Sequence, residues 1–327
     1  MKKANYLIIL FALSIILACT GKSDRSNEQP ADSVISGKLV IFHAGSLSVP
    51  LKEIAQEFRK INPDVEILME AAGSLACARK MTELNQECDI IAVSDYKVID
   101  NMLIPKYCQW NIPFAGNEMI IAFRPDSKLA SEIKTTNWFE ILMRKDVHFG
   151  RSDPNSDPCG YRSIFTMQLS DLFYKKDISN SMILKDQKYI RPKETDLIAL
   201  LEEKELDYIF IYLSVAIQHH LNFLVLPDSI NLKKPELDKL YSGAKLEILG
   251  IKPGQKQLVQ GESMIYGISI PEKASNRKAA EAFLAFLLSP ENGMKIMKKN
   301  GQNPIPPKVN TNYDKVPLVL KKFVLEK

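Results

Sequence analysis

The sequence predicts an α/β protein built as two lobes. Short apolar runs of the kind found in β-strands alternate with segments that show helical periodicity, which indicates βαβ units. The chain has 327 residues, of which 46% are hydrophobic and 25% charged, and this is enough for two separate hydrophobic cores. No internal repeat or low-complexity run interrupts the alternation. Disorder is therefore excluded for most of the chain.

The first part of the chain has the pattern of a mostly parallel sheet. An apolar run at 38–42 (KLVIF) is followed by a segment in which Leu51, Ile54, Ala55 and Phe58 share one helical face. Strand and helix patterns then alternate again. The expected elements are strands at 38–42, 65–69 and 90–93, and helices at 49–60 and 75–84.

A second set of elements begins near residue 118 and returns to the first set near its end. Residues 258–270 are expected to form one long extended return, followed by a helix at 277–288. The strands expected before it lie at 119–123, 147–150, 208–211 and 223–226. We therefore predict a discontinuous lobe 1 of residues 38–117 and 264–327, and a lobe 2 of residues 118–263. Crossings near 116–118 and 260–264 would join them.

The N-terminus has the pattern of an export signal. Lys2 and Lys3 precede an apolar stretch that ends at Ala18 and Cys19, which resembles a bacterial lipoprotein signal. This implies removal of residues 1–18, a lipid on Cys19 and a flexible tether over 19–37, so that the protein is anchored to a membrane in the periplasm or at the cell surface. An ordinary signal peptide and an N-terminal anchor helix are the alternatives.

Charge and cysteine content exclude other classes. The net charge of +4 falls to about +2 once Lys2 and Lys3 are removed, which is too small for a nucleic-acid-binding protein. The four cysteines after Cys19 show neither C-x-x-C spacing nor a histidine at a zinc-like interval, so we expect no metal site. Disulfide pairing stays open. These cysteines are Cys77, Cys88, Cys108 and Cys159.

Glycine and serine follow two consecutive predicted strands, each time before a predicted helix. Gly45 and Ser46 follow the first strand, and Gly73 and Ser74 follow the second. Ligands of open α/β sheets bind beyond the carboxyl ends of strands, and free N–H groups at helix starts favour anions. The two junctions together predict an anion site. At the first junction, the alternative is that Ser46 or Ser48 is only a helix N-cap.

Several longer strings identify a family. They are FHAGSLSVPL, EAAGSLACARKMTEL, CDIIAVSDY, LIPKYCQW, DPCGYRS, IRPKETDL and DYIFIYLSVAIQHH, in this order. The chain from about residue 38 to residue 301 resembles the tungstate/molybdate-binding proteins of ABC importers, the WtpA/ModA family. The most specific string is DPCGYRS, at 157–163.

The resemblance implies a periplasmic-binding-protein type II fold, two α/β lobes joined by two hinge strands, with the ion held between the lobes. It also implies a protein that is not an enzyme, needs no cofactor, acts as a monomer, and works with a permease and an ATPase. Asp157 and Glu194 would coordinate the metal centre of the oxyanion. The implied ligand residues are Gly45, Ser46, Ser74, Asp157, Pro158, Cys159, Glu194 and Tyr212.

Two carboxylates would select among oxyanions. Tungsten(VI) and molybdenum(VI) can accept two further oxygens, whereas the carboxylates would repel sulfate and phosphate, whose central atoms cannot. Arg162 is expected to support Asp157. The segment at 177–189 is shorter than in the family, which leaves the approach of Glu194 less defined. The sequence does not decide between tungstate and molybdate.

Alternatives remain open for these residues. Asp157 could only cap a helix, with Glu194 in the first turn of the next. The ligand could be sulfate, thiosulfate or phosphate, or the two acids could form the acid/base pair of an exported hydrolase. An extracytoplasmic sensor domain is a further alternative, and such a protein should carry a membrane-spanning segment or a signalling domain after the binding fold. His43 is expected to be structural, and His219 and His220 to be solvated rather than metal ligands.

Overall fold

The computed structural model describes residues 34–185, 187–250, 254–309 and 312–326. The predicted signal peptide, Cys19 and the tether up to residue 33 lie outside these residues. The described residues from Ile35 onward form one compact unit. Within the described ranges, every helix is too short or too polar to cross a membrane.

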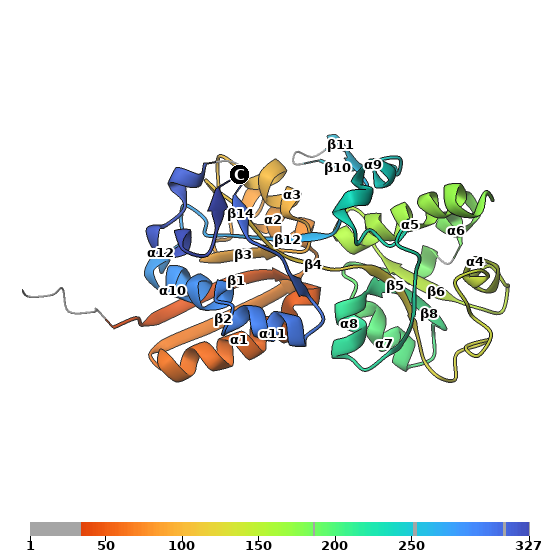
Figure 1. Ribbon diagram of the computed structural model, residues 1–327, viewed down its shortest axis with the longest axis horizontal. Helices are drawn as coiled ribbons and strands as arrows, with labels where there is room; N and C mark the ends of the chain where they lie inside the picture. Colours follow the sequence, from red (N-terminus) through yellow and green to blue (C-terminus); the bar gives the residue numbers. More distant parts are fainter. Residues whose placement is uncertain (1–33, 186, 251–253, 310–311, 327) are drawn as a thin grey trace, which may run out of the picture. The chain divides into compact units, whose positions relative to one another are not determined.

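A six-stranded sheet holds the strands from both ends of this unit, in the order β13-β4-β12-β3-β1-β2 (Figure 1). Strand β1 pairs in parallel with β2 and β3, whereas β12 is antiparallel to β3 and β4. The parallel pairing expected for the first three strands is therefore confirmed, whereas the returning strand β12 enters the middle of the sheet in the opposite direction and makes the sheet mixed. The bounds are β1 Gly37–Ala44, β2 Val65–Ala72, β3 Ile90–Val93, β4 Ile112–Gly116, β12 Ile265–Ser269 and β13 Asn303–Pro304.

Both faces of this sheet are covered by helices, which explains its nearly continuous apolar strands. Leu39 and Ile41 face one hydrophobic cluster and Phe42 faces another. In the first cluster the ring of Phe58 packs edge-on against Phe283, with centroids 5.3 Å apart. The covering helices are α1 Ser48–Ile61, α10 Arg277–Leu288 and α11 Gly293–Lys299 on that face, and α2 Ser74–Thr82 and α3 Tyr96–Val98 on the other.

The middle of the chain forms a five-stranded mixed sheet in the order β7-β6-β8-β5-β9. Strand β8 lies at its centre and is fully buried, parallel to β6 and antiparallel to β5. Helix α5 lies on one side of this sheet, and helices α7 and α8 lie on the other (Figure 1). The bounds are β5 Met119–Phe123, β6 Phe149–Ser152, β7 Ile190–Arg191, β8 Tyr208–Tyr212, β9 Asn222–Val225, α5 Pro158–Tyr174, α7 Asp196–Glu202 and α8 Leu213–Gln218.

Smaller elements complete the described chain. Strands β14 and β15 form a short parallel pair near its end. The remaining bounds are α4 Trp138–Leu142, α6 Ser179–Leu184, α9 Asp238–Tyr241, α12 Leu318–Lys321, β14 Lys308–Val309 and β15 Leu325–Glu326.

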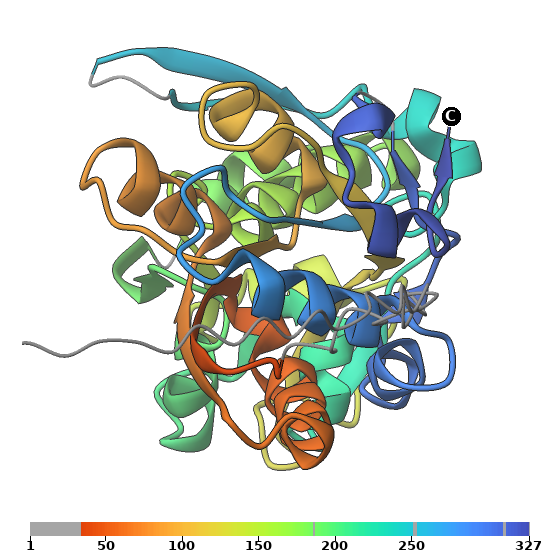
Figure 2. The same cartoon turned by 90° about the vertical axis from the view of Figure 1, so that its left-hand side faces the viewer.

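Segment 117–118 joins β4 of the six-stranded sheet to β5 of the five-stranded sheet, and segment 261–264 returns the chain from β11 to β12. The two segments contact each other through the Asn117 N–H and the Met264 carbonyl at 3.3 Å. The expected continuous strand over 258–270 is wrong. Strand β11 (Lys256–Gln260) pairs antiparallel with β10 (Lys245–Leu249) in a separate hairpin (Figure 2), and β12 begins only at Ile265. The break begins at Gly261, where a Cβ would lie 2.3 Å from the Tyr241 carbonyl oxygen. The two lobes, their bounds and the crossings between them stay a prediction.

Candidate functional site

The two glycine–serine turns lie side by side at one edge of the six-stranded sheet. Gly45 and Ser46 follow β1 in a 3-10 turn, and Gly73 and Ser74 lie at the start of α2, directly after β2. Because β1 and β2 are parallel and pair up to their last residues, their carboxyl ends meet. The sequence predicted this meeting from the order of strands and helices alone.

Neither serine caps a helix. No side-chain capping bond forms at the start of the 3-10 turn, of α1 or of α2. The hydroxyl of Ser46 accepts a hydrogen bond from the Tyr266 hydroxyl at 3.1 Å. The hydroxyl of Ser74 accepts the backbone N–H of Ser94 at 3.0 Å and contacts the Ser94 hydroxyl at 3.1 Å. Both serines are fully buried. The N-cap residues are Ala44 for the 3-10 turn and Leu47 for α1, so the capping alternative is wrong for Ser46 and Ser48.

Asp157 is a helix cap and also contacts a second loop. Its Oδ1 accepts the backbone N–H of Cys159 at 3.2 Å at the start of α5, where Pro158 takes the first helical position. Its Oδ2 accepts the backbone N–H of Glu194 at 3.0 Å. The carboxylate is 1% exposed. Asp157 therefore does cap α5, as the capping alternative states. The same carboxylate also binds the loop after β7 through the Glu194 N–H.

Glu194 is the most unusual side chain of the site. It is 1% exposed, and neither carboxylate oxygen has a hydrogen-bond partner among the described residues. A Cβ added to Gly45 would lie 3.1 Å from Oε1 and 3.2 Å from Oε2. The carboxylate from the loop before α7 therefore lies against the turn that follows β1. Leaving such a group buried and unpaired costs several kcal/mol unless something binds it or a proton neutralises it, as a rough estimate.

A second contact between the elements of the two sheets lies beside the first. A Cβ added to Gly73 would lie 2.2 Å from the Ser156 carbonyl oxygen and 3.0 Å from the Asp157 Cβ. The backbone N–H of Ala76 donates to the same Ser156 carbonyl at 3.2 Å. Glycine at position 73 allows this approach because any side chain there would collide with the backbone.

Burial shifts the acidities of the two carboxyl groups in the same direction. Burial raises the pKa of Glu194 well above its usual value, and the neighbouring Asp157 raises it further. Burial also raises the pKa of Asp157, although the backbone N–H groups of Cys159 and Glu194 oppose the increase. Two adjacent acids in a dry site repel each other when both are ionised. The pair therefore favours a proton or a positively charged centre between its oxygens.

Arg162 does not support Asp157 as expected. Its guanidinium donates to the Tyr212 hydroxyl at 3.1 Å and to the Ser94 carbonyl at 2.7 Å, and it pairs with Asp95 at 3.4 Å. The Tyr161 hydroxyl also donates to Asp95. Because Arg162 follows Asp157 by more than one helical turn, it reaches the end of β3 instead. The two α5 side chains thereby hold the loop after β3.

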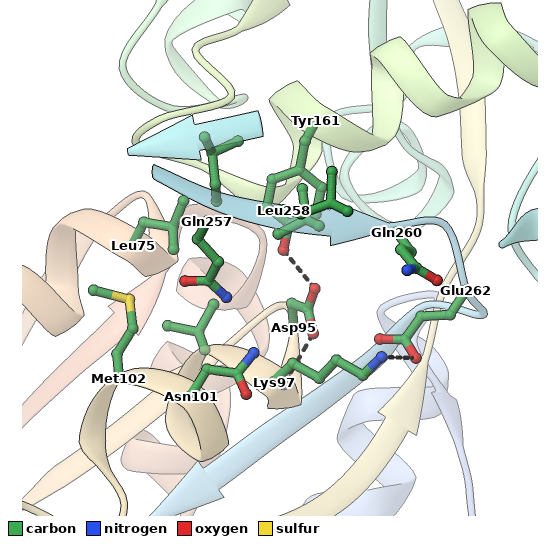
Figure 3. Close-up of a pocket in the computed structure, with 13 residues that line it drawn as sticks. Leu75, Asp95, Lys97, Asn101, Met102, Tyr161, Gln257, Leu258, Gln260 and Glu262 are labelled. Atoms are coloured by element: carbon green, nitrogen blue, oxygen red, sulfur yellow. Dashed lines mark hydrogen bonds and ion pairs between the residues drawn. The ribbon is translucent and has the colours of Figure 1, made fainter. Parts of the chain in front are cut away.

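A cavity of about 330 Å³ lies next to this contact (Figure 3). Asp95 and Tyr161 form part of its wall, and Lys97 pairs there with Glu262 at 2.5 Å. Burial and the nearby Asp95 raise the pKa of Glu262 to about 7. The cavity does not include the serine turns or the Asp157 and Glu194 pair.

The structure thus brings all eight residues implied by the resemblance into one buried region. It also adds Ser94, Asp95, Tyr161 and Tyr266. Ser94 and Asp95 follow β3 as the glycine–serine turns follow β1 and β2, so the rule used for those turns would have found them. Tyr266 lies within β12 and has no local signal in the sequence.

The structure also places the residues for which no binding role is expected. The imidazole of His43 is buried and contacts the Ala44 carbonyl at 2.8 Å. His219 and His220 are exposed. The cysteines Cys77, Cys88, Cys108 and Cys159 are buried free thiols. No group of three His, Cys, Asp or Glu side chains in the described ranges is arranged to hold a metal ion.

Comparison with known proteins identifies the family. The model of the bacterial extracellular solute-binding protein family matches residues 39–302. This chain belongs to that family. Two full-length relatives agree: this solute-binding protein is 46% identical to an uncharacterized solute-binding protein of Petrotoga mobilis over 89% of this chain and 91% of the relative. It is 39% identical to the molybdate/tungstate-binding protein WtpA of Pyrococcus abyssi, over 98% and 97%.

Solved structures of other solute-binding proteins share the fold. The periplasmic molybdate-binding protein of Azotobacter vinelandii matches with a TM-score of 0.58 and 14% identity, over 81% of this chain and 98% of that one. The sulfate-binding protein SubI of Mycobacterium tuberculosis matches with a TM-score of 0.59 and 11% identity, over 88% and 94%. The expected fold class, an α/β solute-binding protein with two sheets, is confirmed.

Proposed function

We propose that this solute-binding protein captures tungstate or molybdate for an ABC importer. The observation that carries the proposal is the Glu194 carboxylate, which is buried, has no partner among the described residues and lies against Gly45. The relationship to WtpA supports the same ligand class.

The chemistry of the two acids favours an oxyanion with a large central atom. Asp157 and Glu194 would repel the oxygens of a sulfate or phosphate dianion, because like charges in a dry site interact strongly. Tungsten(VI) and molybdenum(VI) can accept further oxygen ligands, so each acid would coordinate the central atom. The raised pKa values of both groups indicate that their ionised forms are unfavourable in the protein without an ion. Coordination of such an ion would stabilise the ionised forms.

Hydrogen-bond donors around the acids would hold the oxygens of the ion. The Tyr212 hydroxyl accepts a hydrogen bond from Arg162, so its own hydrogen is left for an oxygen of the ion. The turns with Gly45, Ser46 and Ser74 would present donors from the six-stranded sheet. Pro158 and Cys159 would line the site with backbone at the start of α5, but Pro158 has no N–H to donate and the Cys159 N–H already donates to Asp157. Arg162 would contribute positive charge indirectly through Tyr212.

Capture requires motion, since the acids are almost fully buried. We infer that residues 38–117 and 264–327 form one lobe, that residues 118–263 form the other, and that the segments at 117–118 and 261–264 act as the hinge. The ion would bind to an open form and be enclosed on closure. The closed form would be recognised by a permease with its ATPase. The protein would act as a monomer, exported and anchored through lipid on Cys19.

Calorimetric titration of the purified protein with tungstate, molybdate, sulfate and phosphate tests the proposal. We expect binding of the first two ions alone. Asp157→Asn and Glu194→Gln should each weaken tungstate binding by at least about 100-fold, since loss of an outer-sphere partner of a metal already costs about 10- to 100-fold. Asp207→Asn is the matched control, because Asp207 is also buried but binds the N–H groups of Lys128 and His148.

Equal affinity for sulfate and tungstate would refute the two-acid explanation and leave a general oxyanion-binding protein. Unchanged tungstate binding in Asp157→Asn and Glu194→Gln would show that Asp157 is only a cap. A crystal structure with tungstate in which both carboxylates point away from the ion would also exclude coordination.

A further inference from the structure

We infer that Asn117 and Tyr266 are positioning residues, which direct the hydroxyl hydrogen of Ser46 into the proposed ion site. The inference rests on the proposed function for its meaning, although the hydrogen-bond chain that carries it exists in the protein without an ion. The chain runs from the first segment between the sheets, through β12, to the turn after β1. It begins at Asn117, whose amide orientation is defined by its surroundings.

The side-chain oxygen of Asn117 accepts two backbone hydrogen bonds. The N–H of Glu118 donates to Oδ1 at 2.9 Å, and the N–H of Ser214 donates to it at 3.3 Å. A rotated amide would place its NH₂ group against these two donors, so this orientation is the one the network allows. The Nδ2 group is therefore a donor, and its two hydrogens go to Ser214 Oγ and to the Tyr266 hydroxyl, each at 2.7 Å.

Because Tyr266 accepts a hydrogen bond from Asn117, it acts as the donor to Ser46. Its oxygen accepts from Asn117, so its own hydrogen is free for Ser46 Oγ at 3.1 Å. The tyrosine is fully buried, and burial raises its pKa to about 12, so the hydroxyl keeps its hydrogen at neutral pH. Ser46 Oγ is thereby the acceptor of this bond.

Ser46 is left with one hydrogen and a restricted choice of partners. Its backbone carbonyl already accepts from Gln302 at 2.9 Å, and its hydroxyl oxygen accepts from Tyr266. The serine is fully buried beside Gly45, which faces the Glu194 carboxylate. An oxygen of an ion held against that turn would therefore meet a hydroxyl already oriented to donate. Orientation before binding lowers the entropy lost on binding.

The same amide also touches the other sheet. Ser214 belongs to α8, next to the five-stranded sheet, and the backbone N–H of Asn117 donates to Met264 in the second connecting segment at 3.3 Å. Asn117 therefore lies in the first connecting segment, contacts the second one and α8, and also orients Tyr266. The donor orientation at Ser46 is consequently linked to the arrangement of the hinge.

The test is a double-mutant cycle read by tungstate affinity. Tyr266→Phe keeps the ring and removes the hydroxyl, and we expect affinity to fall by about 2- to 13-fold, the usual value of one neutral hydrogen bond. Ser46→Ala should cost a similar or larger factor. In the Ser46→Ala background, Tyr266→Phe should cost almost nothing further, because its effect passes through Ser46. Tyr208→Phe is the control, since its hydroxyl donates to the Lys128 carbonyl at 2.5 Å, away from the site.

Asn117→Asp separates donation from packing. It keeps the shape of the side chain but replaces the donating group with an acceptor, so Tyr266 would donate to position 117 and Ser46 would lose its orientation. We expect weaker tungstate binding with every hydroxyl still present. Melting temperatures of all variants without ion identify any that fail to fold. Additive losses for Tyr266→Phe and Ser46→Ala would overturn the inference.

Neutron diffraction from the deuterated, ion-free protein decides the question independently of any ligand. A deuterium on the Tyr266 oxygen that points to Ser46 Oγ supports the inference, even if calorimetry refutes the proposed ion. A deuterium on Ser46 that points to Tyr266 overturns it, even if tungstate binds.

Discussion

The backbone N–H of Glu194 donates to Oδ2 of Asp157 at 3.0 Å, so a residue that precedes one helix is held by the N-cap of another. This bond satisfies Asp157 and leaves the Glu194 side chain unpaired. The two acids are therefore unequal. Asp157 is held by backbone donors with or without an ion, whereas Glu194 depends on its protonation or on a ligand.

The ion-free protein should lose stability as the pH rises. The pKa of Glu194 is raised well above its usual value of 4.5 by burial and by Asp157, so the folded form binds the proton more tightly than the unfolded form. The resulting stabilisation is complete below 4.5 and is lost as the pH rises through the raised pKa. We expect the melting temperature to fall as the pH rises above 4.5 and through the raised pKa of Glu194, and to fall less steeply in Glu194→Gln.

Differential scanning calorimetry at several pH values measures this effect. Asp89→Asn is the control, since that buried carboxylate accepts the N–H groups of Val40 and Asn276 and has no unpaired oxygen to relieve. Parallel pH profiles for the wild type and Glu194→Gln would show that Glu194 is not the source of the dependence.

Tungstate binding should release protons. Both acids have raised pKa values, and coordination requires their ionised forms, so the ion displaces any proton that they share. A dianion that approached without coordination would instead favour proton uptake. Calorimetry in buffers of different ionisation enthalpy measures how many protons are released or taken up when tungstate binds. Proton uptake would argue against coordination.

Small substitutions at the glycine turns should weaken binding in a defined order. In Gly45→Ala the new methyl group would lie 3.1 Å from Glu194 Oε1, and we expect tungstate affinity to fall about tenfold or more, because overpacking costs about 1 to 3 kcal/mol. Gly73→Ala should cost more, since its methyl group would lie 2.2 Å from the Ser156 carbonyl oxygen, which cannot rotate away. Titration calorimetry checks the order, and a harmless Gly73→Ala would refute the contact between α2 and the Ser156 loop.

Loss of the Tyr161 contact to Asp95 should speed ion release. This contact joins α5 to the loop after β3, so it can form only when the elements of the two sheets lie together. In Tyr161→Phe we expect the dissociation rate to rise about tenfold or more, because hydrogen bonds to charged groups contribute about 1.5 to 3 kcal/mol, while association changes little. Stopped-flow measurements test this.

Tyr208→Phe is the control for that measurement. Its hydroxyl donates to the Lys128 carbonyl at 2.5 Å and takes no part in the contact with Asp95, so its loss should leave the release rate unchanged. An equal rise in both variants would show a general loss of stability rather than a contact that keeps the ion enclosed.

Local periodicity was sufficient to predict most of the elements. The strands β3 and β5 and the helix α10 have the expected bounds, and the buried face of α1 is the predicted one. The parallel direction of β1, β2 and β3 was predictable, but the direction of the later strands was not. The six-stranded sheet is mixed because β12 runs against β3 and β4, and the five-stranded sheet because β5 runs against β8 and β9. The break at Gly261 depends on its close approach to Tyr241, which lies outside the local sequence.

In the candidate site, too, the residues marked by local patterns were predictable and those defined by distant contacts were not. Residues after strands β1 and β2 were identified because strand ends converge by a general rule. Tyr266 and Asn117 were not identified, because their importance arises from contacts across 220 and 149 positions of the chain. The contacts of Arg162 with Ser94 and Asp95 depend likewise on how α5 lies against β3, which no local pattern encodes.

The position of β12 between β3 and β4 has a consequence for biogenesis. The strand that fills this place begins only at Ile265, so the sheet stays incomplete until most of the chain has been synthesised. Before then, the edges of β3 and β4 are unpaired and open to association with other chains. A nascent polypeptide cut short before this strand would therefore be prone to aggregate, and chaperones would be needed longest for the half of the molecule that is made first.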